Sequence, residues 1–442
     1  MKTTTGLFCR IAWIVALLCG LEREALASRV RMDVGMASTY MEADKKQLGY
    51  IKVGLTGFDL ERERRTPVNV AIVIDRSGSM AGEKIAKARE AAIMAVDRLN
   101  SDDIVSVVAY NDTVSVLVPA TRVSDKSSIR AGIERLEAQG STALFAGVSK
   151  GADEVRKFLS KHRVNRVILI SDGQANVGPS STSALAELGE SLAKERICVT
   201  TIGLGLDYNE DLMTQLARKS DGNSGFANSS DDLVRLMRAE FGDVLAVVAQ
   251  ELVVRIDCED GIRPVRVLGR EAEIEGGRAL VQINQLNAGQ EKYVLLEVEL
   301  PATRSGKTRE VASVTVTYAN MATRSTDKLS GTTSVRFTDS PAEVERSINR
   351  DVMVAVVTQT AVERNKLAVE LRDKGRIEEA RAVLGDNAAY LKDNASKLES
   401  RELGSYGERN ADDARNLDEA NWGRQRKDMR YMQRSTEHQQ SW

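Results

Sequence analysis

Five oxygen-bearing side chains in three separate segments of the chain have the types and order of a site for a hard metal ion. The five residues are Asp75, Ser77, Ser79, Thr142 and Asp172. The first three alternate directly after the apolar run at residues 70–74, where a buried strand would end. Open α/β sheets bind ligands at the carboxyl ends of their strands. Two carboxylates and three hydroxyls suit Mg²⁺ rather than a softer metal.

The spacing of these residues indicates how they would meet. Gly78 is expected to allow a tight turn that directs both serines toward one point. Thr142 would arrive from the loop before a helix at 143–160, and Asp172 from the end of a strand at 164–170. Neutral hydroxyls would fill much of the inner shell, so the ion would keep much of its charge and an open position. Such a site suits the capture of a Glu or Asp carboxylate from another protein.

Simpler roles remain open for the same residues. Asp75 and the two serines could cap a helix at 83–99, because Ser and Asp favour such positions. Arg76 could contact an acidic partner or be solvated. Asn111 and Asp112 fit a hairpin turn better than a binding site, and Asn176 is expected to order the loop after Asp172.

The elements that would position these residues alternate between strand and helix from residue 68 to about 244. Apolar runs at 69–74 and 164–170 are typical of strands buried on both faces. Helical periodicity over 83–99, 143–160 and 181–195 separates the runs. The pattern predicts an α/β fold with a doubly wound, mostly parallel sheet.

Residues 68–244 resemble a von Willebrand factor type A (vWA) domain. Residues 75–79, Thr142 and Asp172 match the metal-ion-dependent adhesion site of that family, and the segments 171–178 and 203–211 resemble its bacterial members. The resemblance implies a Rossmann-like sheet and a Mg²⁺ or Mn²⁺ ion held by Asp75, Ser77, Ser79, Thr142 and Asp172. It also implies a role in adhesion or assembly rather than catalysis.

The flanking segments have other patterns. Period-two alternation after residue 246 predicts an antiparallel β-sandwich, which strands before residue 65 would complete. A helical hairpin follows, expected to pack on the sandwich, and the charged end of the chain suggests disorder. The expected organisation is a signal peptide at 1–27, an N-terminal β segment at 28–66, a vWA domain at 67–245, a β-sandwich at 246–340, a helical hairpin at 341–399 and a disordered tail at 400–442.

The beginning of the chain has the features of an export signal. An apolar stretch at 11–21 is followed by Ala25-Leu26-Ala27, a small-residue cleavage pattern. We therefore expect an exported protein, periplasmic or secreted, without a transmembrane segment. Two cysteines lie outside the signal, Cys198 and Cys258, and they could form a disulfide or remain two separate thiols.

Composition and residue counts argue against several function classes. Lys and Arg total 62 against 64 for Asp and Glu, a net charge of -2, which gives no basic footprint for nucleic acid. The 2 histidines, His162 and His438, have no evident triad or zinc partners. No phosphate-binding Gly-rich loop is present in the sequence. We therefore expect no enzymatic activity.

The sequence favours an exported, metal-dependent protein-binding module. In this hypothesis the ion at Asp75 coordinates an Asp or Glu carboxylate of a partner protein. An alternative is a structural cell-envelope assembly protein in which the ion only stabilises the fold. A third hypothesis, a metal-assisted hydrolase using the strand-end carboxylate, has weaker support because Ser77 stands where a second carboxylate is usual.

Overall fold

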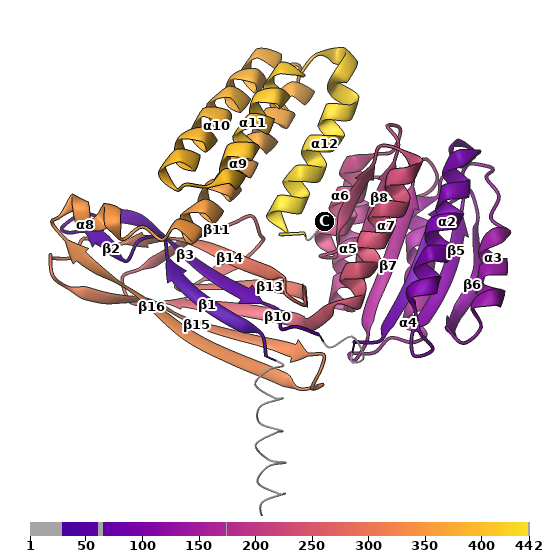
Figure 1. Cartoon of the computed structure of the whole chain (residues 1–442), viewed down its shortest axis with the longest axis horizontal. Coiled ribbons are helices and arrows are strands. Elements are labelled where there is room, and N and C mark those ends of the chain that lie inside the picture. The colour runs from indigo at the N-terminus through magenta and orange to yellow at the C-terminus, as the bar shows by residue number, and fades with distance from the viewer. Residues whose placement is uncertain (1–28, 61–64, 174, 441–442) are drawn as a thin grey trace, which may run out of the picture.

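The computed structural model describes residues 29–60, 65–173 and 175–440. The predicted signal peptide lies outside these residues. The chain forms an α/β domain, a β-sandwich and a helical domain, and Figure 1 shows the helical domain at the top of the view, between the other two.

A six-stranded sheet forms the centre of the α/β domain, in the order β6-β5-β4-β7-β8-β9. Its strands are parallel except β6, which is antiparallel to β5. The strand bounds are β4 (Val68–Asp75), β5 (Ile104–Tyr110), β6 (Val114–Arg122), β7 (Val164–Ser171), β8 (Cys198–Leu204) and β9 (Ser224–Ala227). Every residue of β4, β5, β7 and β8 is buried, as expected for strands covered on both faces.

Helices cover both faces of this sheet. On one face α2 (Glu83–Arg98), α3 (Lys126–Glu134) and α7 (Ser230–Leu245) close one apolar core. On the other face α4 (Leu144–Arg156), α5 (Thr182–Lys194) and α6 (Glu210–Lys219) close a second core. The predicted doubly wound α/β architecture is therefore confirmed.

The β-sandwich has one sheet in the order β1-β3-β14-β11 and another in the order β12-β13-β10-β15-β16-β2. Its strands are β1 (Arg31–Met36), β2 (Tyr40–Glu42), β3 (Gln47–Thr56), β10 (Val247–Cys258), β11 (Arg263–Leu268), β12 (Glu273–Glu275), β13 (Arg278–Asn287), β14 (Glu291–Leu300), β15 (Thr308–Asn320) and β16 (Thr326–Thr338). The two sheets enclose a common apolar core. Because β3 pairs with β14, the α/β domain is an insertion between two strands of the sandwich.

The C-terminal part is entirely helical, and here the prediction of a disordered tail was wrong. Its helices are α8 (Pro341–Arg346), α9 (Arg350–Asp373), α10 (Ile377–Lys397), α11 (Arg401–Arg415) and α12 (Glu419–Glu437). A hairpin of α9 and α10 cannot bury its apolar face alone. Leu403, Leu417 and Met429, from the segment expected to be disordered, are buried against that face. At the other end of the hairpin, α9 packs on Leu268 and Leu295 of the sandwich.

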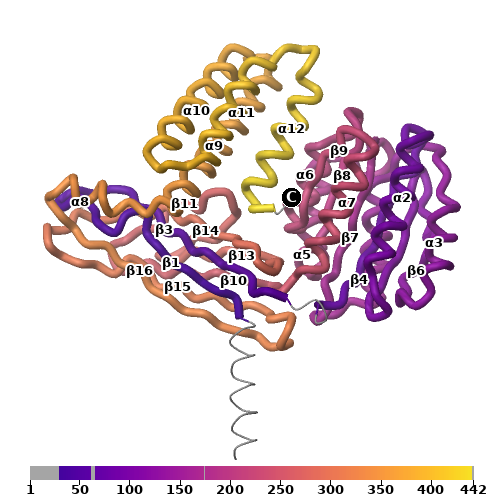
Figure 2. Tube along the Cα trace, in the orientation of Figure 1, coloured from indigo at the N-terminus to yellow at the C-terminus, as the bar shows by residue number. Residues whose placement is uncertain are grey.

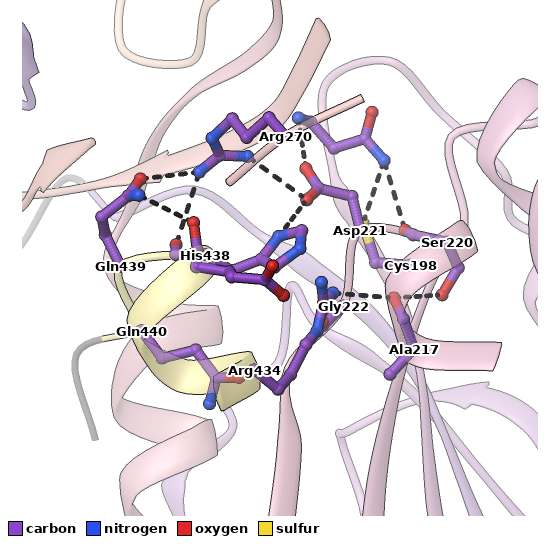
Figure 3. A network of polar contacts seen from close by, with 12 residues as sticks. Cys198, Ala217, Ser220, Asp221, Gly222, Arg270, Arg434, His438, Gln439 and Gln440 are labelled. Carbon is purple, nitrogen blue, oxygen red and sulfur yellow. Dashed lines mark hydrogen bonds and ion pairs between the residues drawn. The ribbon is translucent and has the colours of Figure 1, made fainter. Parts of the chain in front are cut away.

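Helix α12 returns from the helical domain to the α/β domain, as the tube in Figure 2 shows. Lys427 is buried and donates to the Tyr208 carbonyl at 2.9 Å, and it forms an ion pair with Glu210. Farther along, Arg434 donates to the Gly222 carbonyl at 3.0 Å, and His438 lies 3.3 Å from Asp221 (Figure 3). The helix therefore ties the C-terminal helical domain to the α/β domain.

Two further expectations can be compared with the described residues. Within them, no helix combines the length and the apolar character needed to cross a bilayer. Cys198 and Cys258 are both free thiols. Burial raises the pKa of each thiol to about 11.

Candidate functional site

The five predicted residues lie at the carboxyl edge of the α/β sheet, around the end of its central strand. Asp75 is the last residue of β4, which lies between β5 and β7. The chain continues from β4 to β5 on one side and reaches β7 on the other, so this is a topological switch point. Tyr110 and Ser171 end the two neighbouring strands beside Asp75.

Asp75 is fully buried, with 0% of its surface exposed, and is bound by neutral donors. Its Oδ1 accepts from the Ser77 backbone N–H at 2.8 Å, and its Oδ2 accepts from Ser171 Oγ at 2.6 Å. Among the described residues, no cation forms an ion pair with it. Burial raises the pKa of Asp75, and the hydrogen bonds from Ser171 and Ser77 oppose that shift. A buried carboxylate in this state would be stabilised by a cation.

Asp172 follows β7 directly and is also fully buried. Its Oδ1 accepts a hydrogen bond from Ser79 Oγ at 2.8 Å, and Ser79 Oγ lies 3.1 Å from Ser77 Oγ. Its Oδ2 forms an ion pair with the Lys84 ammonium group. The two predicted serines therefore connect the loop after β4 to the carboxylate after β7.

Thr142 reaches the same place from the loop before α4. Its backbone N–H donates to Asn176 Oδ1 at 2.9 Å, and its carbonyl accepts from the Asn176 N–H at 3.1 Å. A Cβ atom built on Gly173 would lie 2.9 Å from Thr142 Oγ1 and 3.5 Å from Asp75 Oδ2. The threonine hydroxyl and the Asp75 carboxylate thus flank one small residue, Gly173, which follows Asp172 directly. Asn176, which was expected to order the loop after Asp172, joins that loop to the Thr142 loop through these two bonds.

The hairpin between β5 and β6 supports the Thr142 loop. Asn111 Nδ2 donates to the Gln139 carbonyl at 2.9 Å, and Asp112 accepts from the Ser141 N–H. Gly140 has a φ of +80°, and a Cβ there would lie 2.3 Å from Asp112 Oδ1, so this position requires glycine. Asn111 and Asp112 are turn residues, as expected, and they also fix the loop that carries the threonine.

The structure bears on three expectations about the loop after β4: the turn at Gly78, the cap of α2 and the position of Arg76. Gly78 lies in a short 3-10 helix, outside the left-handed region, and a Cβ there would meet only the Gly140 carbonyl at 3.6 Å. The turn therefore does not depend on glycine. Helix α2 is preceded by Gly82 and has no side-chain cap, so Asp75 and the serines do not cap it. The guanidinium of Arg76 donates to Asn111 Oδ1 at 3.2 Å, which turns part of it toward the hairpin.

Sequence reasoning missed three residues of the site. Ser171 ends an apolar strand and looked like part of it, although its place directly before Asp172 was a usable signal. Tyr110 ends β5, and its buried hydroxyl lies beside Asp75; burial first, and then the charge of Asp75, hold the pKa of Tyr110 well above its usual value. Lys84, in the first turn of α2, gave no signal because most lysines at such positions point to solvent.

The donor set fits a hard divalent cation. Within the described part of the chain, no three His, Cys, Asp or Glu side chains gather in an arrangement suited to a metal. A cation here would depend on hydroxyl ligands together with the carboxylates of Asp75 and Asp172, which is chemistry that Mg²⁺ and Mn²⁺ accept. Ser79 and Ser141 are exposed, so one side of the site faces solvent.

Comparisons with known proteins agree with this architecture. A family model for the von Willebrand factor type A domain matches residues 69–239. The uncharacterized protein sll0103 of Synechocystis is 27% identical over 373 residues, which cover 79% of this chain and 87% of that protein. Human inter-alpha-trypsin inhibitor heavy chain H3 is 29% identical over 170 residues, which cover 36% of this chain and 19% of that protein. The uncharacterized protein YfbK of Escherichia coli is 25% identical, and the chain spans 46% of its length.

Two solved structures are similar over nearly the whole chain. A von Willebrand factor type A protein from Catenulispora acidiphila has a TM-score of 0.72 at 16% identity, covering 92% of this chain and 96% of that one. The ArnB paralog VWA2 from Sulfolobus acidocaldarius has a TM-score of 0.62 at 18% identity, covering 92% and 98%. At such identities the likeness concerns the fold alone. Together with the family match and the geometry of the sheet, it shows that residues 69–239 form a von Willebrand factor type A domain.

Proposed function

We propose that this protein is an exported, metal-dependent protein-binding module, periplasmic or secreted. The ion, Mg²⁺ or Mn²⁺, would be held at the carboxyl edge of the sheet by Asp75, Ser77, Ser79, Thr142 and Asp172. The bound ion would supply Lewis acidity toward a carboxylate oxygen. The partner is a protein that offers an Asp or Glu side chain.

The observation that carries the proposal is the state of Asp75. It is a wholly buried carboxylate that receives neutral hydrogen bonds and has no cationic partner among the described residues. An unpaired charge that is buried away from water costs several kcal/mol of folding free energy. Three hydroxyls beside it supply further oxygen donors and leave the charge of a cation largely unneutralised, which favours an external carboxylate as a ligand.

The names of relatives support protein binding at a coarser level. The name of the inter-alpha-trypsin inhibitor heavy chains describes them as parts of an inhibitor of trypsin, which is itself a protein. WAV3 of Arabidopsis is an E3 ubiquitin-protein ligase, but this chain covers only 37% of it at 25% identity. We carry over from these names only the contact with other proteins. The absence of enzymatic activity stays a prediction.

A structural assembly role is the second candidate. Its support is the close packing of the three parts, with α12 bonded to the α/β domain through Lys427 and Arg434. In that case a bound ion would stabilise the fold, and no acidic partner would compete for the site.

Titration of Mg²⁺ and Mn²⁺ into the mature, metal-stripped chain tests the metal site, and capture of a partner with and without metal separates the two candidates. Asp75→Ala should weaken binding at least about 100-fold, since outer-shell changes alone cost about 10–100-fold. Asp97→Ala is the control: this residue lies on α2 but pairs with Arg130 outside the site. Capture of a partner that persists in EDTA, or in Asp75→Ala, would contradict the proposal. Metal-dependent stability without metal-dependent capture would favour the assembly role.

A further inference from the structure

Lys84 is placed where it can take part in metal binding without being a ligand. It lies in the first turn of α2, and its ammonium group forms an ion pair with Asp172 Oδ2. Its side chain is 28% exposed, whereas that of Asp172 is 0% exposed. The ammonium group therefore reaches from the surface into the buried edge of the sheet.

The two carboxylates of the site differ in how their charge is balanced. Asp172 has Lys84, the only cation within ion-pair distance of it among the described residues. Asp75 has none. Asp172 Oδ1 accepts from Ser79 Oγ at 2.8 Å, whereas Asp172 Oδ2 pairs with Lys84. The ammonium group and a predicted metal ligand therefore share one carboxylate.

The loop after β8 lies beside the Lys84 head group. A Cβ built on Gly205, in that loop, would be in ordinary contact with Lys84 Nζ, at 3.7 Å. The ammonium group therefore lies between this loop and Asp172.

We propose that Lys84 is a built-in counter-cation that competes with the metal ion for Asp172 and thereby lowers the metal affinity of the site. This inference rests on the proposed function. Without metal, the ammonium group compensates a buried carboxylate that would otherwise be unpaired. With metal, two cations would lie near the same carboxylate and repel each other, so each weakens the binding of the other. Lys84 thus sets the ion concentration at which the site fills.

The test replaces the ammonium group by a neutral side chain of similar length. Lys84→Met should bind Mg²⁺ about tenfold more tightly or better, because a nearby positive charge is removed. In EDTA the same variant should unfold at a lower temperature than the wild type. Saturating Mg²⁺ should raise the unfolding temperature of the variant more than it raises that of the wild type. Lys84→Arg retains the charge and should leave the affinity within about threefold of the wild type.

Lys87→Met is a matched control. Lys87 lies one turn later on the same helix with nearly the same exposure, 27%, and it pairs with Glu90 and Asp231 rather than with the site. It should not change Mg²⁺ affinity. Labelling with an amine-reactive reagent adds a direct measurement of competition: Mg²⁺ should increase the reaction of Lys84 and leave that of Lys87 unchanged.

The possible results separate this inference from the proposed function. Wild-type binding with equal or weaker affinity in Lys84→Met would overturn the inference alone. Binding only in Lys84→Met would support it in its strongest form, with Lys84 blocking the site. Absence of binding in both proteins would overturn the inference together with the proposed metal site.

Discussion

Asp75 and Asp172 lie at the ends of neighbouring strands, yet their side chains are held differently. Asp75 receives only neutral donors, from Ser77 and Ser171. Asp172 shares its oxygens between Ser79 and the ammonium group of Lys84. A site built in this way has one carboxylate in need of a cation and one already supplied with it.

Gly173 tests whether the hydroxyl of Thr142 has to lie where it does. A Cβ there would come within 2.9 Å of Thr142 Oγ1, closer than side-chain carbons approach such atoms, so the threonine would have to move. We predict that Gly173→Ala weakens Mg²⁺ binding about tenfold, comparable to the loss of a supporting contact. Titration calorimetry measures the change.

Gly78→Ala is the control for that prediction. It lies in the same site, but its Cβ would meet only one carbonyl oxygen, at 3.6 Å, an ordinary contact. It should leave Mg²⁺ affinity unchanged. Equal losses in the two variants would mean that any alanine in these loops disturbs the site, and that the placement of Thr142 is not the cause.

Four of the five site residues were predictable because they lie at a strand end or directly after one, and Thr142 lies in the loop before α4. Their alternation after an apolar run, and the order of the three segments, identify the edge where they meet. Lys84 was not predictable. Its contact with Asp172 depends on how α2 lies against the end of β7, a tertiary arrangement that helical periodicity does not encode.

At the scale of elements, the apolar runs predicted β4 and β7 because strands buried on both faces are mostly apolar. Asn69, Asn165 and Arg166 are buried polar exceptions in these two strands. Composition gave the wrong prediction for α11 and α12. These helices are rich in charged residues, and they bury polar side chains such as Asn410 and Arg434 as well as the apolar Leu403 and Met429. Charge content alone therefore suggested disorder.

Helix α11 contains a buried carboxylate whose charge disfavours folding. Asp413 accepts from Asn365 Nδ2 at 3.5 Å and from Gln425, and burial raises its pKa to about 6. Since the folded value exceeds the unfolded value of about 4, its stabilising contribution is complete below about pH 4 and is lost as the pH rises through about 6. Asp413→Asn should therefore gain stability relative to the wild type between pH 4.5 and 7.5, by up to about 3 kcal/mol.

Thermal unfolding followed by circular dichroism at both pH values measures this gain. Asp412→Asn is the control, because Asp412 is the neighbouring residue with 60% of its side chain exposed. A difference between Asp413→Asn and wild type that is the same at both pH values would show that the charge of Asp413 is already compensated in the folded protein.

At the scale of the whole molecule, the last helix connects parts that are far apart in the sequence. Arg434 and His438 of the chain end contact Gly222 and Asp221 of the α/β domain, as Figure 3 shows. Arg426 adds ion pairs to Glu210 and Asp211. The segment that sequence composition assigned to a tail is thus part of the framework that holds the α/β domain.

Truncation after residue 399 tests that role. It would expose Leu384 and Leu391, which are fully buried in the intact chain, and remove the residues that cover them. Each buried side chain of this kind is worth about 1.5–3 kcal/mol. We predict a lower unfolding temperature, binding of a hydrophobic dye and faster proteolysis within α9 and α10. An unchanged unfolding temperature would show that the helices after residue 399 contribute no packing.

The central claim is that a divalent cation binds where the five residues meet. Its most direct test is anomalous diffraction at the manganese absorption edge from crystals of the mature chain grown with Mn²⁺. The account predicts one anomalous peak within coordinating distance of the hydroxyls of Ser77, Ser79 and Thr142. A fully determined structure at saturating Mn²⁺ with no peak at this edge of the sheet, or with its peak elsewhere, would contradict it.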